Sequence, residues 1–93
     1  MSDMTKVNTG AVKNGAENIL NQAKAFKAAY DALYATIHDL RSTWTSADGN
    51  SYIAKIDSYQ EDFDSMYAKL TAAADGINQI ADNYDKTVKK NML

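Results

Sequence analysis

Two apolar stripes, each with steps of alternately four and three residues, are the feature that most limits how this chain can fold. The first stripe consists of Val12, Ala16, Ile19, Ala23, Phe26, Tyr30, Leu33, Ile37, Leu40 and Trp44. The second consists of Tyr52, Ile56, Tyr59, Phe63, Met66, Leu70, Ala73, Ile77, Ile80 and Tyr84. This spacing places each set on one face of an α-helix. The sequence therefore predicts an all-α fold of two long amphipathic helices.

Between the stripes, the segment from Ser42 to Ser51 is rich in small, polar and turn-forming residues. We expect the chain to reverse there, and a connection this short makes the two helices antiparallel neighbours. Residues 1–93 are predicted to form a single helical hairpin domain. Its helices should cover about 8–42 and about 47–90, with a turn at about 43–46.

Cap signals support these boundaries. Asn8 is the predicted N-cap of the first helix and Ser46 that of the second. Asp48 lies in the first turn of the second helix, where a negative charge complements the helix dipole. Within the second helix, only Gly76 interrupts the run of helix-compatible residues.

The apolar faces are wider than a single helix-helix contact can cover. Leu20 and Tyr34 widen the first stripe, and the second is widened by Ile53, Tyr67, Ala74, Ala81 and Val88. Faces this broad are typical of helices in bundles of three or four. We therefore expect two hairpins to pair into a four-helix bundle, either with a second copy or with a related hairpin. The predicted core and dimer residues are Phe26, Tyr30, Leu33, Ile37, Leu40, Ile56, Tyr59, Phe63, Met66 and Leu70.

Composition argues against several classes of partner. The net charge is −2, and acidic and basic residues are mixed along both helices, so no basic face is available for nucleic acid. No segment is apolar enough for stable membrane insertion, and the polar segment from Met1 to Thr9 lacks the core of a signal peptide. Cysteine is absent, which excludes disulfides and thiolate metal sites.

The sequence offers little for catalysis or for cofactors. The only histidine, His38, follows core position Ile37 and should face solvent. Asp57 and Glu61 lie one helical turn apart, a spacing that can hold a divalent cation, but no third ligand type is evident. We therefore predict no metal site, no cofactor and no enzyme activity.

The residues at the predicted turn resemble a known family. Trp44-Thr45-Ser46 lies midway along the chain, with Ser51 and Tyr52 after it. This arrangement is similar to the WXG family of small type VII (Esx) secretion proteins, whose signature is a Trp-x-Gly turn between two long helices. The likeness covers nearly the whole chain. Ser46 stands where the family usually has glycine, and a serine can occupy that position as an N-cap.

The resemblance implies an antiparallel hairpin that forms a homodimer or heterodimer and has no enzyme activity. It also implies export through the type VII apparatus of a Gram-positive or mycobacterial cell, by a route independent of a signal peptide, and a role in virulence. The implied partners are the export ATPase and a toxin with a helical targeting domain. Trp44 would then serve as a structural anchor or as half of a cleft with the partner chain.

The carboxyl-terminal Tyr-x3-Asp/Glu signal of many family members has no match, because Tyr84 is followed four residues later by Val88. A looser family pattern has a hydrophobic residue, an acid four residues later, and hydrophobic residues three and seven beyond the acid. It fits Ala81, Asp85, Val88 and Met92, which we predict as a possible export signal read by a groove on the ATPase. The alternative for Val88 and Met92 is ordinary helix packing.

Two functional hypotheses follow. In the first, the chain is an exported, non-enzymatic dimer that acts as an effector, or as a carrier for a helical toxin or sister protein. In the second, it is a cytosolic helical adaptor or chaperone that is not exported.

Overall fold

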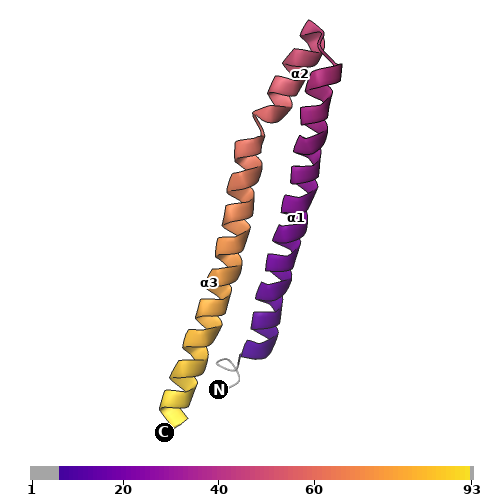
Figure 1. Ribbon diagram of the computed structural model, residues 1–93. Helices are drawn as coiled ribbons and strands as arrows, with labels where there is room; N and C mark the ends of the chain where they lie inside the picture. The colour runs from indigo at the N-terminus through magenta and orange to yellow at the C-terminus, as the bar shows by residue number, and fades with distance from the viewer. Residues whose placement is uncertain (1–6, 93) are drawn as a thin grey trace.

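The computed structural model describes residues 7–92, with side chains up to residue 89, and it forms an antiparallel helical hairpin (Figure 1). Helix α1 covers Thr9–Thr43, α2 covers Ala47–Asp57 and α3 covers Gln60–Met92. No strand is present in this described part of the chain. The predicted all-α hairpin is confirmed. The molecule is a rod of 71 × 19 × 15 Å, with the α1–α2 turn at one end and the start of α1 and the end of α3 toward the other (Figure 1).

Both predicted N-caps are confirmed. The Asn8 side chain accepts a hydrogen bond from the backbone N–H of Ala11 at 3.0 Å. The Ser46 hydroxyl accepts one from the backbone N–H of Gly49 at 3.2 Å. Each bond satisfies an N–H in the first turn that has no partner within its own helix. The two helix starts are thus fixed by side chains adjacent to them in sequence.

The second helix is not continuous, although the sequence predicts one helix over about 47–90. It breaks at Ser58 and Tyr59, where the Tyr59 N–H bonds to the Ile56 carbonyl only three residues back, at 3.0 Å. The hydroxyl of Tyr34, on α1, donates to the same carbonyl at 2.8 Å. In an unbroken helix this carbonyl would accept the N–H of residue 60. A side chain that occupies the helical ladder is a known cause of such breaks, and it comes here from the other arm of the hairpin.

The contact between the two arms is built on small residues. The buried residues of α1 recur every seven residues: Ala16, Ala23, Tyr30 and Ile37. They face the buried residues of α2 and α3, which are Ile53, Ala74 and Ala81. Alanines facing one another let the helices approach closely. On α2 and α3, the contact is therefore centred on Ile53, Ala74 and Ala81, which lie at the edge of the second stripe. Tyr59 and Met66, predicted among the core and dimer residues, are exposed within the hairpin.

Residues three and four positions beyond a buried residue lie on opposite sides of the contact between the arms. In this hairpin one of these two sides is polar and the other is apolar. On the polar side, Lys13 Nζ lies 2.6 Å from Asp82 Oδ1 and 3.6 Å from Asp85 Oδ2. Arg41 forms an ion pair with Asp57 on the same side. The apolar side is lined by large hydrophobic residues from both arms, and only part of their surface is covered.

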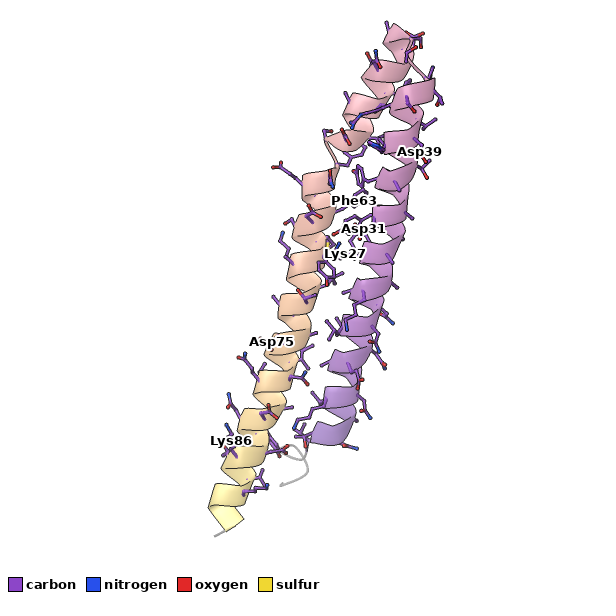
Figure 2. All side chains as sticks on the ribbon, viewed as in Figure 1. Lys27, Asp31, Asp39, Phe63, Asp75 and Lys86 are labelled. Carbon is purple, nitrogen blue, oxygen red and sulfur yellow. The ribbon has the colours of Figure 1, made fainter. Side chains whose placement is uncertain are left out.

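Aromatic rings fill the middle of the hairpin. Phe63 lies between the two long helices (Figure 2), with its ring centroid 5.9 Å from that of Phe26, 5.6 Å from Tyr30 and 6.3 Å from Tyr34. The Tyr30 hydroxyl donates to Asp64 Oδ1 at 2.9 Å. Burial and this hydrogen bond to a carboxylate both raise the pKa of Tyr30. The cluster thus joins large aromatic side chains from both arms.

The rod shape leaves little interior. The radius of gyration is 21.1 Å, whereas a compact domain of this length would have about 12 Å. Most of the buried side chains in the described part are alanine or isoleucine. A large share of the apolar surface therefore stays accessible in a single hairpin.

Candidate functional site

At the turn, the indole of Trp44 lies against the backbone of α2. A Cβ atom placed on Gly49 would come within 2.6 Å of indole Cγ, so only glycine permits this contact. Gly49 is buried, while Trp44 is 42% exposed and stacks on Tyr52 with ring centroids 6.4 Å apart. The outer surface of the turn is therefore an aromatic pair.

Ser46 occupies the position of the motif glycine without strain. Its φ and ψ of −67° and 160° are in the extended region, and its hydroxyl caps α2. The close approach that requires glycine falls instead at Gly49, which the sequence reading missed. A glycine inside a predicted first turn, five residues after the tryptophan, was the available signal.

A row of apolar residues follows α2 and α3 on the apolar side, one every seven residues. We call it the outer stripe: Tyr52, Tyr59, Met66, Ala73 and Ile80, all exposed. Tyr52 is 61% exposed, Met66 49% and Ile80 69%. Each lies four residues before a partly buried residue that points toward α1, at positions 56, 63, 70, 77 and 84.

Helix α1 contributes a second row to the same side. We call it the α1 stripe: Val12, Ile19, Phe26, Leu33 and Leu40. Leu33 is exposed and the other four are partly buried. The outer stripe and the α1 stripe together form what we call the apolar face. Large exposed apolar patches on small proteins are typical of interaction sites.

The predicted export signal is only partly accessible in the hairpin. Ala81 is 2% exposed and packs toward α1. Asp85 accepts a hydrogen bond from the Thr9 hydroxyl at 2.7 Å and pairs with Lys13. Val88 is exposed, and the side chain of Met92 lies outside the described residues. For a partner to contact Ala81, the end of α3 would have to separate from α1, whereas the Asp85 side chain is 40% exposed in the hairpin.

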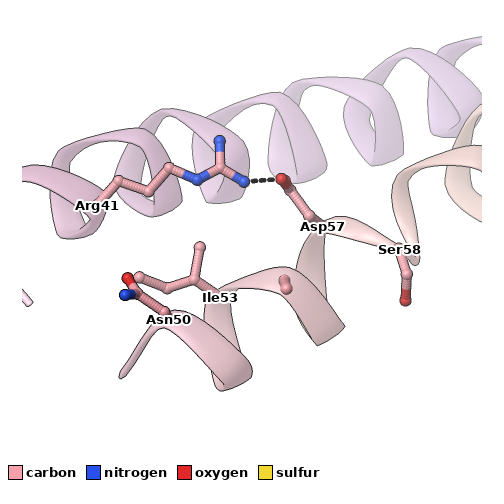
Figure 3. Close-up of a pocket in the computed structure, with 6 residues that line it drawn as sticks. Arg41, Asn50, Ile53, Asp57 and Ser58 are labelled. Atoms are coloured by element: carbon pink, nitrogen blue, oxygen red, sulfur yellow. Dashed lines mark ion pairs between the residues drawn. The ribbon is translucent and has the colours of Figure 1, made fainter. Parts of the chain in front are cut away.

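A cavity of about 540 Å³ lies on the polar side near the turn, open to solvent (Figure 3). Its lining residues are Arg41, Asn50, Ile53, Ala54, Asp57 and Ser58. The guanidinium of Arg41 and the carboxylate of Asp57 point toward each other across it and neutralise one another (Figure 3). This arrangement has neither a nucleophile next to a base nor an unpaired charge that would attract a substrate.

Other potential sites have little chemistry. His38 is exposed, as predicted. Among the described residues, no three His, Cys, Asp or Glu side chains are grouped so that they could hold a metal ion. Within the described residues, none of the helices has the length and apolar character needed to cross a membrane.

Comparison with known proteins identifies the family. The family model described as "Proteins of 100 residues with WXG" matches residues 4–89. Searches of curated proteins and of solved structures give no match. The matched segment includes both arms of the hairpin and the Trp44 turn. The chain therefore belongs to the WXG100 family, the small helical proteins associated with type VII secretion.

Proposed function

We propose that this protein is exported by a type VII (Esx) system as a dimer of hairpins. In this role it acts as a non-enzymatic effector, or as a carrier for a helical toxin or sister protein. The observation that supports the proposal best is the apolar face, a long exposed surface on one side of a rod that buries little by itself. Membership of the WXG100 family supports the link to type VII secretion.

Pairing explains the apolar face physically. Tyr52, Met66 and Ile80 each leave a large part of their side chains in water. Burial of apolar surface yields about 25 cal/mol per Å², and a stable interface buries about 1,600 Å² in total. A second hairpin placed on this face would cover both stripes at once. The chain would leave the cell in this paired, folded state, and its localisation would be cytoplasmic before export and extracellular after it.

The test of export is the appearance of the chain in the culture medium. Its native cell is grown with and without the export ATPase, and medium and lysate are compared. We expect the chain in medium only when the ATPase is present. Finding it in medium from both strains, or only in the lysate of both, would exclude export by this route.

The end of α3 can be tested separately. Val88 is the exposed member of the predicted signal whose side chain is described. Val88→Ser should leave the hairpin folded, because little of its burial comes from this residue, and should reduce the amount secreted. The matched control is Thr87→Ala, an exposed neighbour outside the pattern. Unchanged secretion of Val88→Ser would remove this end as the signal.

A cytosolic helical adaptor or chaperone is the second candidate. The burial of Ala81 against α1 favours it, because this residue is then not accessible to an export receptor, and Asp85 is already paired with Thr9 and Lys13. The same comparison of medium and lysate decides between the two candidates.

A further inference from the structure

At the end of the rod away from the turn, the start of α1 lies along α3, whose last turns extend beyond it (Figure 1). The Thr9 hydroxyl donates to Asp85 Oδ1 at 2.7 Å. Lys13 Nζ lies 2.6 Å from Asp82 Oδ1 and 3.6 Å from Asp85 Oδ2. Because Thr9 and Lys13 lie one helical turn apart, both contact the same short stretch of α3. We call these four residues the polar clasp.

The apolar contact beneath the polar clasp is made by small side chains. Its buried residues are Ala16, which is 1% exposed, and Ala81, which is 2% exposed. An alanine side chain is a single methyl group, so little apolar area returns to water when this contact opens. The aromatic cluster around Phe63 begins at Phe26, about 15 Å further along α1. This end of the hairpin is therefore held by small side chains and partly exposed polar pairs, whereas aromatic rings hold the middle.

Two glycines weaken α1 in the same region. Gly10 and Gly15 lie inside the helix, within its first two turns. A Cβ atom on Gly15 would meet nothing within 4 Å, and one on Gly10 would lie 3.4 Å from Asn8 Oδ1, an ordinary contact. Packing therefore requires glycine at neither position. Each glycine favours opening of its helical segment about fivefold relative to alanine, so residues 9–16 can unfold while the rest of the hairpin stays packed.

The part of α3 beneath these turns includes the predicted export signal. Ala81, Asp85 and Val88 are spaced by four and three residues, so they lie on one face of the helix. In the closed hairpin Val88 is exposed, whereas Ala81 is buried and Asp85 belongs to the polar clasp. Unfolding of residues 9–16 would uncover this face while α3 stays helical. The apolar face would lose only Val12.

We propose that residues 9–16 are an autoinhibitory segment, which covers this face of α3 and must unfold before a partner with a helix-binding groove can contact it. The inference rests on the proposed export and assigns a regulatory role to the start of α1. The remainder of the hairpin, with the rings around Phe63, stays packed while the segment opens. A fivefold smaller open population then weakens the apparent affinity of such a partner fivefold.

Thiol labelling tests the opening, because the chain has no cysteine of its own. Ala81→Cys places a thiol beneath the segment, where a thiol reagent reaches it only after the segment opens. Ala74→Cys is the matched control, since Ala74 is 3% exposed, also on α3, and nearer to the aromatic cluster. We expect Ala81→Cys to react at least tenfold faster than Ala74→Cys. Hydrogen exchange of the wild-type chain checks this without a substitution, because amides 13–16 should exchange at least tenfold faster than amides 26–40.

A glycine substitution tests which helix opens. The methyl group added in Gly15→Ala meets no atom within 4 Å, so it favours the helical state of α1 without new contacts. Labelling of Ala81→Cys should therefore slow about fivefold. Gly76→Ala is the matched control, because its methyl group is equally free of contacts but lies in α3. It should leave the labelling rate unchanged, since α3 stays helical during the opening.

The polar clasp and export are tested with the same variants. Lys13→Met removes both ion pairs of the clasp and should speed the labelling of Ala81→Cys about threefold. Lys24→Met is the exposed control and should leave the rate unchanged. In the native cell, Gly15→Ala should lower the amount secreted, whereas Gly76→Ala should be secreted like wild type.

Several outcomes would overturn the proposal. Equal labelling of Ala81→Cys and Ala74→Cys, with uniform hydrogen exchange along α1, excludes a segment that opens separately. Equal slowing by Gly76→Ala and Gly15→Ala shows that α3 unfolds instead. If Gly15→Ala slows labelling but is secreted like wild type, the segment does not control export. A wild-type chain absent from the medium overturns the proposed export, whereas the labelling rates still decide whether the segment opens.

Discussion

At the scale of single residues, the turn depends on the contact between Trp44 and Gly49. The indole lies on the first turn of α2, at a point where any side chain would overlap it. The hydroxyl cap of Ser46 then fixes where α2 begins. Together these contacts allow an exposed aromatic pair to sit on a short connection, because one face of the indole is covered by backbone.

Gly49→Ala should lower the free energy of unfolding by about 1–3 kcal/mol, because the added methyl overlaps the indole and must displace it. Chemical denaturation measures the loss, and the fluorescence of Trp44, the only tryptophan, reports the displacement. Gly76→Ala is the control. Nothing lies within 4 Å of its added Cβ, so a helix-interior alanine should stabilise by about 0.5–1 kcal/mol. Wild-type stability and emission in Gly49→Ala would contradict this account.

At the scale of helices, the two arms influence each other through hydrogen bonds. The break between α2 and α3 has neither proline nor glycine, and the Tyr34 hydroxyl on α1 occupies a carbonyl at that point. Burial of this hydroxyl raises the pKa of Tyr34. The direction of α2, and with it the position of the Trp44 turn, is thus set by a residue on the opposite arm.

Tyr34→Phe should free the Ile56 carbonyl and allow α2 and α3 to join into one helix. The backbone chemical shifts of residues 58 and 59 should move toward helical values. Tyr30→Phe is the matched control, because it also removes a hydroxyl bond between the arms, but to the side chain of Asp64. It should cost about 1 kcal/mol and leave those shifts unchanged. If residues 58 and 59 stay non-helical in Tyr34→Phe, the cause of the break is local.

The ion pairs on the polar side should make stability depend on pH. The hydrogen bond from Lys13 lowers the pKa of Asp82, so its stabilisation is present above the ordinary carboxyl pKa and is lost as pH falls through the lowered value. The same hydrogen bond is the main cause of the raised pKa of Lys13. At high pH the stabilisation is therefore lost as the pH rises through the raised pKa of Lys13. Lys13→Met should melt below wild type at neutral pH. The difference should begin to shrink near the ordinary carboxyl pKa of about 3.9 and vanish once the pH is below the lowered pKa of Asp82. A constant difference at all pH values would indicate lost packing instead; Lys24→Met serves as the exposed control.

At the scale of the whole molecule, the hairpin is a thin rod whose largest packed cluster surrounds Phe63. Few other large side chains are covered on both sides. In the proposed dimer of hairpins, the apolar face would become the core of a four-helix bundle. Folding and pairing would then be coupled, since each helix would obtain much of its burial from the other hairpin.

Phe63→Asp should abolish the dimer and most of the helicity together, because it places a charge without a partner among three aromatic rings. Circular dichroism and sedimentation at micromolar concentration check this. Phe63→Leu keeps an apolar side chain and should remain a helical dimer. A helical monomer from Phe63→Asp would show that the hairpin is stable without pairing.

The helical state of each segment, the position of the turn and both N-caps could be predicted because they depend on local chemistry. Apolar spacing, the side chains of Asn8 and Ser46, and the small polar residues between the stripes act over a few neighbouring residues. The likeness to the WXG family also depends on local features, namely Trp44 and its place between two long helices. These features determine an all-α hairpin.

Which residues face the other arm was decided only by the tertiary structure. On the second arm, the row with Ala74 and Ala81 and the row with Tyr59 and Met66 are similarly apolar. The row with Ala74 and Ala81 packs against α1, because alanines allow the helices to approach closely. The row with Tyr59 and Met66 was thereby left on the surface. The break at Ser58 and the need for Gly49 have the same origin, because each is imposed by a side chain that only the folded chain brings near. Local sequence determines which segments become helices, whereas packing between helices determines which faces remain free for a partner.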